Sequence, residues 1–240
     1  MTQTNTNCKI IVITSGKGGV GKTTTTANIG AGLAMKGYKV ALIDTDTGLR
    51  NLDLLLGLEN RIMYDLVDVT SGKIPYKKAL VRHKKYETLF LLPTSQTKDK
   101  LAVSPEQVVA LCSEMSADFD FILIDCPAGI EQGFKTAVAA ADIALVVTMP
   151  EISAVRDADK IIGELNRADK ENILLIVNRI RPDMVAKGEM LDLDDINDIL
   201  AIKCIGQIPD DEMVVSSTNR GEPVIANTKS QAGIAYQNIT

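Results

Sequence analysis

The chain has 240 residues, 45% of them hydrophobic, and its 26 Lys and Arg against 31 Asp and Glu give a formal net charge of −5. This acidity argues against a surface built to neutralise a phosphate backbone, so no nucleic-acid partner is expected. The lack of Trp and the 4% aromatic content argue against a single-strand binder. No apolar run approaches the ~18 residues of a membrane span, and residues 1–7 lack the apolar core of a signal peptide.

The four cysteines lie far apart in the sequence, at positions 8, 112, 126 and 204. Because no C-x-x-C pair occurs, they predict neither a zinc site nor a disulfide framework. We expect reduced, mostly packed thiols and a protein that is made and kept in the cytoplasm.

Short apolar runs rich in β-branched residues alternate with helical patterns along the chain. Runs of this length predict strands that are buried on both faces, as in a parallel sheet covered by helices. We expect these strands at residues 9–14, 39–44, 88–92, 119–125, 143–149, 173–178 and 203–208.

Three helices carry terminal signals. The first, residues 22–36, ends before Gly37, and the second begins after Ser104 with Pro105 in its first turn. Ser153 is predicted to cap a third helix that runs through residue 168. The alternation predicts an α/β fold with a single doubly wound, mainly parallel sheet of seven or more strands and helices on both faces. Since no linker or repeat interrupts the chain, we expect one domain over residues 1–240.

A glycine-rich segment, SGKGGVGKTT at residues 15–24, follows the first strand and opens the first helix. This context makes its G-x-x-x-x-G-K-[ST] pattern a strong prediction of a phosphate-binding loop for ATP. Glycines let the backbone N–H groups turn inward around phosphate oxygens, and the helix N-terminus adds positive potential. Lys22 is expected to contact the β- and γ-phosphates, and Thr23 to contact Mg²⁺. The candidate nucleotide-binding residues of the loop are Gly16, Lys17, Gly18, Gly19, Val20, Gly21, Lys22, Thr23 and Thr24.

Acidic residues end two of the predicted strands. Asp125 follows the run Phe-Ile-Leu-Ile, as a Walker B carboxylate does, and is suited to hold a water of Mg²⁺. Asp44 and Asp46 end the second strand and face the same edge of the sheet. Phosphoryl transfer needs mainly positioning and charge stabilisation, so one carboxylate directed at the attacking water suffices.

The loop GKGGVGKTT carries a second lysine, Lys17, and resembles the deviant Walker A family of P-loop ATPases. In that family this lysine reaches across a dimer interface to the partner's phosphates; the alternative is a solvated loop lysine. The resemblance implies that Asp46 is the switch I aspartate, which orients the attacking water and belongs to the Mg²⁺ site with Thr23 and Asp125; a helix N-cap is the alternative. The catalytic residues it implies are Lys17, Lys22 and Asp46. It also implies an adenine site at Asn178, Arg179, Pro209 and Asp210, although an Asn at a strand end is also an ordinary turn residue.

Longer strings resemble the MinD proteins, the ATPases that position bacterial division sites. They are DTDTGLRNLDLLLGL at 44–58, LPTSQTKDK at 92–100, DCPAGIE at 125–131, PEISAVRDADKI at 150–161 and GEPVI at 221–225. The resemblance implies an ATP-dependent homodimer, hydrolysis stimulated by a partner, and recognition of MinE- and MinC-like proteins. It places the dimer and partner face at Arg50, Asn51, Asp53, Glu151, Ser153, Asp157 and Asp159, although exposed charges at helical spacing also suit a solvated face. Cys126 departs from the more usual serine.

Three other functions remain as alternatives. A ParA-type partitioning ATPase shares Lys17, Lys22 and Asp46 but is expected to carry a basic DNA face. An iron–sulfur carrier ATPase needs paired cysteines that converge at the dimer axis, but Cys126 alone is expected near the active edge and no C-x-x-C pair occurs. A nucleotide-binding assembly module that never hydrolyses is disfavoured by Asp46 and Asp125.

The resemblance also bears on the membrane. Family members end in a short basic amphipathic helix; residues 230–240 resemble the helix that precedes it, so we expect that basic helix to be absent from residues 1–240. We therefore expect residues 1–240 to bind membranes poorly even with ATP. Full-length members associate peripherally with the inner face of the cell membrane, since two helices presented by one dimer bind far better than one.

Overall fold

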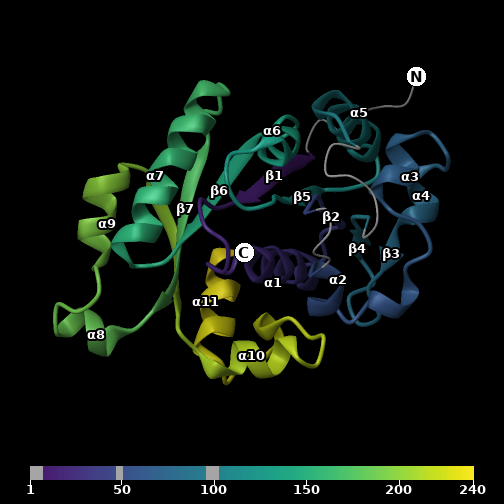
Figure 1. Ribbon diagram of the computed structural model, residues 1–240. Helices are drawn as coiled ribbons and strands as arrows, with labels where there is room; N and C mark the ends of the chain where they lie inside the picture. The colour runs from purple at the N-terminus through teal and green to yellow at the C-terminus, as the bar shows by residue number, and fades with distance from the viewer. Residues whose placement is uncertain (1–7, 47–50, 96–102) are drawn as a thin grey trace.

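The computed structural model describes residues 8–46, 51–95 and 103–240, and its strands form one sheet (Figure 1). The order across this eight-stranded sheet is β3-β4-β2-β5-β1-β6-β7-β8. Every neighbouring pair is parallel except β3 and β4, which are antiparallel. The strands are β1 (Lys9–Thr14), β2 (Val40–Asp44), β3 (Val81–Arg82), β4 (Leu89–Leu92), β5 (Phe121–Asp125), β6 (Ile143–Thr148), β7 (Ile173–Ile180) and β8 (Lys203–Pro209).

Helices cover both faces of the sheet, which confirms the predicted α/β fold class. The described helices are α1 (Lys22–Met35), α2 (Leu52–Leu55), η1 (Glu59–Arg61), α3 (Leu66–Thr70), α4 (Tyr76–Ala79), α5 (Pro105–Met115), α6 (Gln132–Val138), α7 (Ile152–Arg167), α8 (Pro182–Ala186), α9 (Leu193–Leu200), α10 (Glu212–Thr218), η2 (Val224–Ala226) and α11 (Gln231–Ile239).

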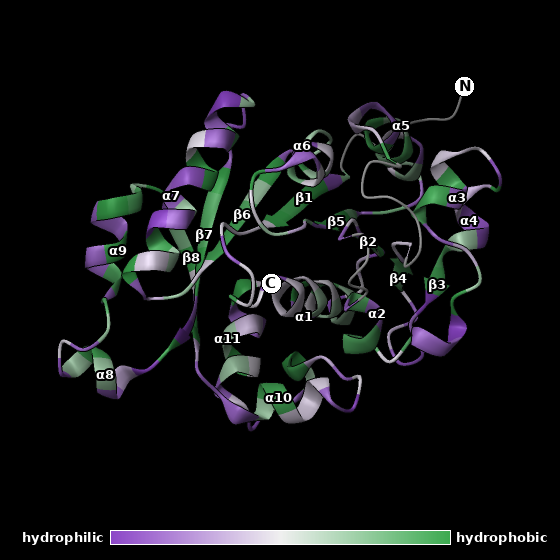
Figure 2. Ribbon diagram, viewed as in Figure 1, coloured by the Kyte–Doolittle hydropathy of each residue, from purple (hydrophilic) through white to green (hydrophobic). Residues whose placement is uncertain are grey.

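Two apolar clusters form the core, one on each side of the sheet. Successive strand residues point to opposite faces, so Val12 joins one cluster while Ile11 and Ile13 join the other. Helices α3 to α7 and α9 pack in the first cluster, and α1, α2, η2 and α11 in the second. Figure 2 shows the hydrophobic strands between these layers and the hydrophilic stretches along α7. The continuous apolar runs of the sequence thus reflect burial on both faces.

Most predicted elements are present, and two differences have physical causes. Strand β3 has two residues, too short to give a periodic pattern. Ser153 was predicted to cap α7, and this is wrong: the helix begins at Ile152, and its N-cap is Glu151, which makes no side-chain capping bond. Glu151 has the extended backbone angles of an N-cap residue, and the helix begins at the next residue. Ser153 is therefore already inside the first turn and cannot be the cap.

Two other predicted helix ends agree with the structure. Gly37 follows α1 with φ 91°, the left-handed conformation that favours glycine after a helix. Ser104 forms a capping box with Gln107, whose N–H lies 3.3 Å from the serine Oγ.

The carboxyl ends of the central strands gather at one edge of the sheet. Asp125 of β5 is in register with Asp44 of β2 and with Ile13 of β1, two residues before the glycine-rich loop begins. The loop and the acidic strand ends therefore meet where ligands of parallel sheets bind.

Helix α11 anchors the helix that follows the loop. The hydroxyl groups of Thr25 and Tyr236 are 3.1 Å apart in the buried contact between α1 and α11. The Asn28 Oδ1 accepts the N–H of Ile225 at 2.8 Å. Two hydrogen bonds thus fix α1, and the loop at its start, against the end of the described chain.

Candidate nucleotide site

A pocket of about 360 Å³, here called the nucleotide pocket, opens beside the glycine-rich loop. The loop contributes most of its walls, and α2, β7 and α10 supply the rest. Its lining residues are Ser15, Lys17, Gly19, Gly21, Lys22, Thr23, Thr24, Asn51, Leu54, Leu55, Arg179 and Thr218. Of these, Leu54 and Leu55 lie within the string at 44–58 but had no predicted role, and no motif in the sequence points to Thr218.

The loop needs glycine for two different reasons. Gly19 and Gly21 have φ values of 83° and 98°, where a side chain would be strained. Gly16 instead lies against α7, and a Cβ on it would be 2.2 Å from the carbonyl oxygen of Asp157. Because that obstacle is backbone, the loop and α7 are held at a separation that only glycine allows.

Lys22 and Thr23 begin α1 beside Asp125, the predicted Walker B carboxylate. Lys22 is 8% exposed and Asp125 is 1% exposed. Thr26 Oγ1 donates to Asp125 Oδ1 at 3.0 Å. Burial raises the pKa of Asp125, while the Lys22 charge and hydrogen bonds from Thr23 and Thr26 oppose that rise. The site therefore carries a buried carboxylate beside a buried ammonium group, next to the phosphate loop.

The two other carboxylates at this edge are linked to each other. The Asp46 backbone N–H donates to Asp44 Oδ1 at 2.9 Å. Burial raises the pKa of Asp44 well above its ordinary range, with further raising by the charge of Asp125. A cation would relieve this crowding of negative charge.

The donor set suits Mg²⁺ bound together with a nucleotide. Among the described residues, no three His, Cys, Asp or Glu groups are placed to hold a metal by themselves. Mg²⁺ is usually held by one or two protein groups, water and substrate phosphates, rather than by an all-protein cage. The Thr23 hydroxyl and the Asp125 carboxylate, next to a phosphate loop, fit that pattern.

Lys17 turns toward α7 in the single chain. Its Nζ lies 3.9 Å from Glu151 Oε2, and the two side chains are 44% and 53% exposed. An ion pair this exposed is weak, so Lys17 is free to exchange Glu151 for a stronger anionic partner.

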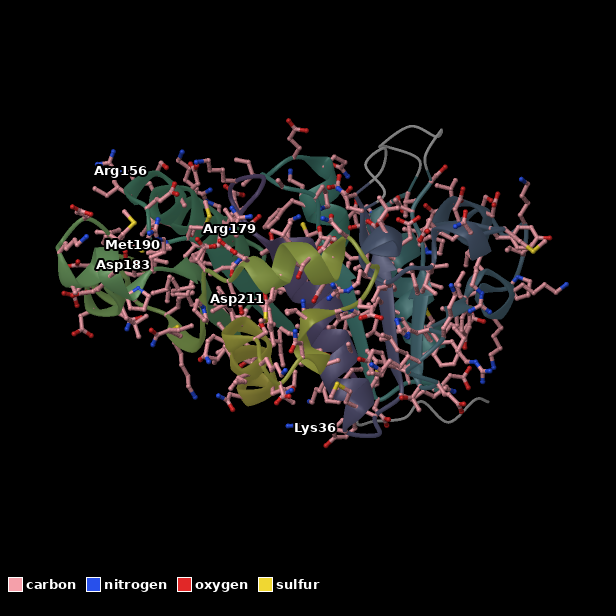
Figure 3. All side chains as sticks on the ribbon, turned by 90° about the horizontal axis from the view of Figure 1, so that it is seen from below. Lys36, Arg156, Arg179, Asp183, Met190 and Asp211 are labelled. Atoms are coloured by element: carbon pink, nitrogen blue, oxygen red, sulfur yellow. The ribbon has the colours of Figure 1, made fainter. Side chains whose placement is uncertain are left out.

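The four predicted adenine-site residues occupy different surroundings. Asn178 is 6% exposed, and its Nδ2 donates to the carbonyl of Val20 at 2.7 Å, so this amide holds the phosphate loop in place. Arg179, with φ 58°, lines both the nucleotide pocket and an adjoining pocket of about 590 Å³ that also contains Asp210. Pro209 ends β8. Figure 3 shows Arg179 between the α7–α9 side of the molecule and α11.

The predicted partner-face residues divide into exposed and buried groups. Glu151, Ser153 and Asp159 are exposed on α7, beside Ile152, an exposed apolar residue that sequence reasoning missed. Asp157 is half-buried, and its Oδ1 accepts from Lys160 Nζ at 3.0 Å.

The remaining three residues of that face follow Asp46 closely in the sequence. Asn51 precedes α2 and lines the nucleotide pocket. Asp53 is 2% exposed, and its Oδ1 accepts the N–H of Leu54, so in the single chain it supports α2 from inside. Arg50 lies outside the described residues.

The sequence of residues 11–224 matches the family described as the CobQ/CobB/MinD/ParA nucleotide binding domain. The chain is 54% identical over 233 residues to the septum site-determining protein MinD of Bacillus subtilis, covering 95% of this chain and 86% of that protein. It is 55% identical to the protein of the same name from Synechocystis, with 96% and 87% covered.

Solved structures are similar as well. MinD in the MinC:MinD cell division protein complex of Aquifex aeolicus is 51% identical, with a TM-score of 0.90 and with 96% of this chain and 93% of that chain covered. MinD of Pyrococcus horikoshii complexed with Mg-ADP is 30% identical, with a TM-score of 0.86 and with 97% and 94% covered.

Proposed function

We propose that this chain, which belongs to the MinD proteins within the CobQ/CobB/MinD/ParA nucleotide-binding family, is an ATP-driven switch that positions the cell-division site. The observation that carries the proposal is the phosphate loop at the sheet edge, with Asp125 and Asp46 beside it on a MinD-like fold. The relatives named septum site-determining proteins, and the MinD that is solved with MinC, support the division-site role.

Hydrolysis, in this proposal, rests on positioning. The loop N–H groups and Lys22 hold the β- and γ-phosphates, and the hydroxyl of Thr23 and the carboxylate of Asp125 hold Mg²⁺. When bound, Mg²⁺ neutralises charge on the phosphates. Asp46 orients the attacking water, and its backbone is held by Asp44 Oδ1. The Mg-ADP complex of the Pyrococcus relative supports this choice of ligands.

The switch, in this proposal, is a change between one chain and two. With ATP bound, Lys17 leaves Glu151 for the phosphates of an opposing copy, which joins two chains face to face. A MinE-like partner then accelerates hydrolysis, and a MinC-like inhibitor binds the ATP-bound dimer. Such a ligand shifts the equilibrium only through its differential affinity for the two states. The weak, exposed pairing of Lys17 with Glu151 supports the exchange.

Peripheral membrane association belongs to the same proposal. Among the helices of the described residues, none has the length and apolar content to cross a bilayer. We infer that the cycle alternates between the cytoplasm and the inner face of the cell membrane, as the resemblance implies for full-length family members.

The alternatives gain less support. The solved structure of a ParA family ATPase from Chlorobium tepidum has 22% sequence identity to this chain, and this likeness indicates only a shared fold. Cys126 is fully buried, and burial raises the pKa of its thiol to about 12, which does not favour a thiolate ligand for an iron–sulfur cluster. The MinD function is therefore preferred to DNA partitioning and to cluster transfer.

The test is size-exclusion chromatography of wild type and Asp46→Ala with MgADP and then with MgATP. Asp46→Ala is expected to elute as a dimer only with MgATP, since the phosphate cradle remains while turnover is slowed. Phosphate release should fall by a factor on the order of 10² or more, the scale for losing a catalytic group. An Asp46→Ala monomer in MgATP would contradict the switch, and wild-type phosphate release in the variant would remove Asp46 from the mechanism.

A further inference from the structure

A second pocket, of about 250 Å³, lies away from the phosphate loop. It is bounded by the residues that follow α2, the turn between β3 and β4, and the segment after α10. We call it the basic pocket. Its lining residues are Leu56, Gly57, His83, Lys84, Lys85, Tyr86, Arg220, Gly221, Glu222, Pro223 and Ala226.

The charge around this pocket is opposite to that of the whole chain. Residues 71–87 contain six Lys and Arg and one Glu, a net charge of +5 in a chain whose total is −5. In the pocket itself, Lys84, Lys85 and Arg220 face one carboxylate, that of Glu222. Within the described part of the chain, none of these three cations forms an ion pair. Among the described residues that line it, the pocket therefore carries more cationic than anionic side chains.

A buried histidine in the pocket lacks an acceptor. His83 is 7% exposed, and its Nδ1 accepts the backbone N–H groups of Lys85 and Tyr86, both at 3.1 Å. A neutral imidazole that accepts at Nδ1 carries its proton on Nε2. In the described residues Nε2 is buried and has no hydrogen-bond partner. A buried donor of this kind costs free energy unless a ligand or water oxygen accepts from it.

Two close contacts shape the walls of the pocket. A Cβ placed on Gly221 would lie 2.6 Å from the Cα of Gly57, so the two glycine backbones are in close contact. The rings of His83 and Tyr86 stack with their centroids 4.8 Å apart. Pre-organised walls lower the ordering cost of binding.

We propose that the basic pocket is a binding site for a phosphate monoester or inorganic phosphate. Lys84, Lys85 and Arg220 supply the charge, and a phosphate oxygen accepts the Nε2–H of His83. A phosphate offers several strong acceptors and up to two negative charges, which match three cations, one carboxylate and one unpaired donor. This site is separate from the phosphate loop, and its ligand is not the hydrolysed nucleotide.

The chain's single histidine provides a local probe. The experiment uses the full chain, saturated with MgADP so that the phosphate loop is occupied. Inorganic phosphate is titrated at constant ionic strength, with chloride as the reference anion, while ¹⁵N spectra record the Nε2 signal and the amides of Gly57 and Gly221. Saturable shifts at these three positions, absent with chloride, are expected. No saturable shift, or equal shifts with chloride, would overturn the proposal.

Two double variants separate the pocket from general charge. Lys84→Ala/Lys85→Ala should weaken phosphate binding at least tenfold. Lys135→Ala/Lys203→Ala removes the same charge from exposed positions on α6 and β8, and should leave the affinity unchanged. Equal affinity in the wild type and the Lys84/Lys85 variant, both folded by circular dichroism, would refute the site.

The source of the phosphate is distinguished by parallel titrations. Glycerol 3-phosphate and vesicles of phosphatidylcholine containing phosphatidic acid represent a lipid headgroup, and inorganic phosphate represents a free anion. Stronger binding of glycerol 3-phosphate, with a His83 shift on the acidic vesicles, assigns the site to a headgroup; stronger binding of inorganic phosphate assigns it to the free ion. Vesicle binding with no His83 shift from any probe would reduce the pocket to a basic surface and overturn the proposal.

Discussion

Asp44 and Asp125 end neighbouring strands in register, and both carboxyl groups are almost fully buried at the edge that faces the phosphate loop. Burial is the largest cause that raises the pKa of each carboxyl group, and the charge of Asp125 raises the pKa of Asp44 further. The fold thus keeps two buried acids at the edge where a nucleotide and a cation are expected to bind. Such sites are commonly maintained at a cost in stability.

The first prediction concerns Asp44→Asn. The ordinary pKa of this carboxyl is 3.8, and the folded value is higher, so the folded state holds the proton more tightly. Its contribution to stability is therefore present below pH 3.8 and is lost as pH rises through the raised folded value. Asn keeps an Oδ1 acceptor for the Asp46 N–H and carries no charge. We expect the variant to be more stable than wild type at pH 8 by about 0.5–2 kcal/mol.

Urea unfolding of the nucleotide-free protein between pH 4 and pH 8 measures this difference. The advantage of Asp44→Asn should grow as pH rises and then level off. Saturating MgADP should reduce it, since a cation relieves the wild-type charge. The control is Asp194→Asn, on the exposed surface of α9, which should leave the pH profile unchanged. Equal stabilities of wild type and Asp44→Asn at pH 8 would show that the charged Asp44 carboxylate does not destabilise the folded protein.

The sequence predicts the nucleotide site as far as local patterns reach. The order of strand, glycine-rich loop and helix placed Lys22 and Thr23, and the buried run before Asp125 placed that carboxylate, because each signal is contained in about ten consecutive residues. The family resemblance supplied the choice of Asp46 over Asp44. The fold class follows from the same local runs, repeated along the chain.

Contacts between distant segments were not predictable in this way. Gly16 lies against Asp157, and Thr218 lines the nucleotide pocket. Neither contact leaves a hydrophobic pattern in the sequence around these residues. The failed cap at Ser153 has a local cause, since the chain already takes extended angles at Glu151 and enters the helix at once. The burial of Asp53 depends on how α2 packs against the rest of the protein. A helix of four residues is too short for its sequence to show which face is buried.

The second prediction concerns Lys17→Ala. The variant should retain weak nucleotide binding but fail to dimerise with MgATP, because the missing charge belongs to the opposite chain's site. Its stability should stay within about 0.5 kcal/mol of wild type, since the pair with Glu151 is long and exposed. Sedimentation velocity with MgATP measures the dimer, and Lys135→Ala is the charge-matched control. A Lys17→Ala dimer of normal affinity would mean that the lysine acts within its own chain.

The third prediction compares two glycines of the loop. Gly16→Ala places a Cβ 2.2 Å from the Asp157 carbonyl oxygen, so either the loop or α7 must move. Gly18→Ala meets nothing within 4 Å, and Gly18 has no positive φ. Nucleotide affinity should fall at least tenfold in Gly16→Ala, which corresponds to a loss of about 1.4 kcal/mol of binding free energy. In Gly18→Ala it should stay within about twofold of wild type. Titration with a fluorescent ADP analogue measures both, and equal affinities would show that the loop shifts freely against α7.

The last prediction concerns the anchor of α1, the hydroxyl pair of Thr25 and Tyr236. Tyr236 is 1% exposed and Thr25 is fully buried, so Tyr236→Phe leaves the threonine hydroxyl without this partner. An unsatisfied buried hydroxyl costs about 1–3 kcal/mol, and for a chain of this size each kcal/mol lowers Tm by about 2–4 °C. Thermal unfolding of Tyr236→Phe should therefore show a fall of several degrees. Tyr38→Phe, which removes a hydroxyl from a ring that is 43% exposed, should show almost none.

A double-mutant cycle with Thr25→Val assigns the loss to the pair. Because Thr25→Val removes the orphaned hydroxyl itself, adding it to Tyr236→Phe should cost less than it costs alone, which gives a coupling of about 0.5–3 kcal/mol. Thr25 lies two residues after Thr23, so loosening this bond should also weaken MgADP binding, measured by calorimetry, while Tyr38→Phe leaves it unchanged. Strictly additive stabilities would mean that the two hydroxyls do not depend on each other, and that α1 is held against α11 by apolar packing alone.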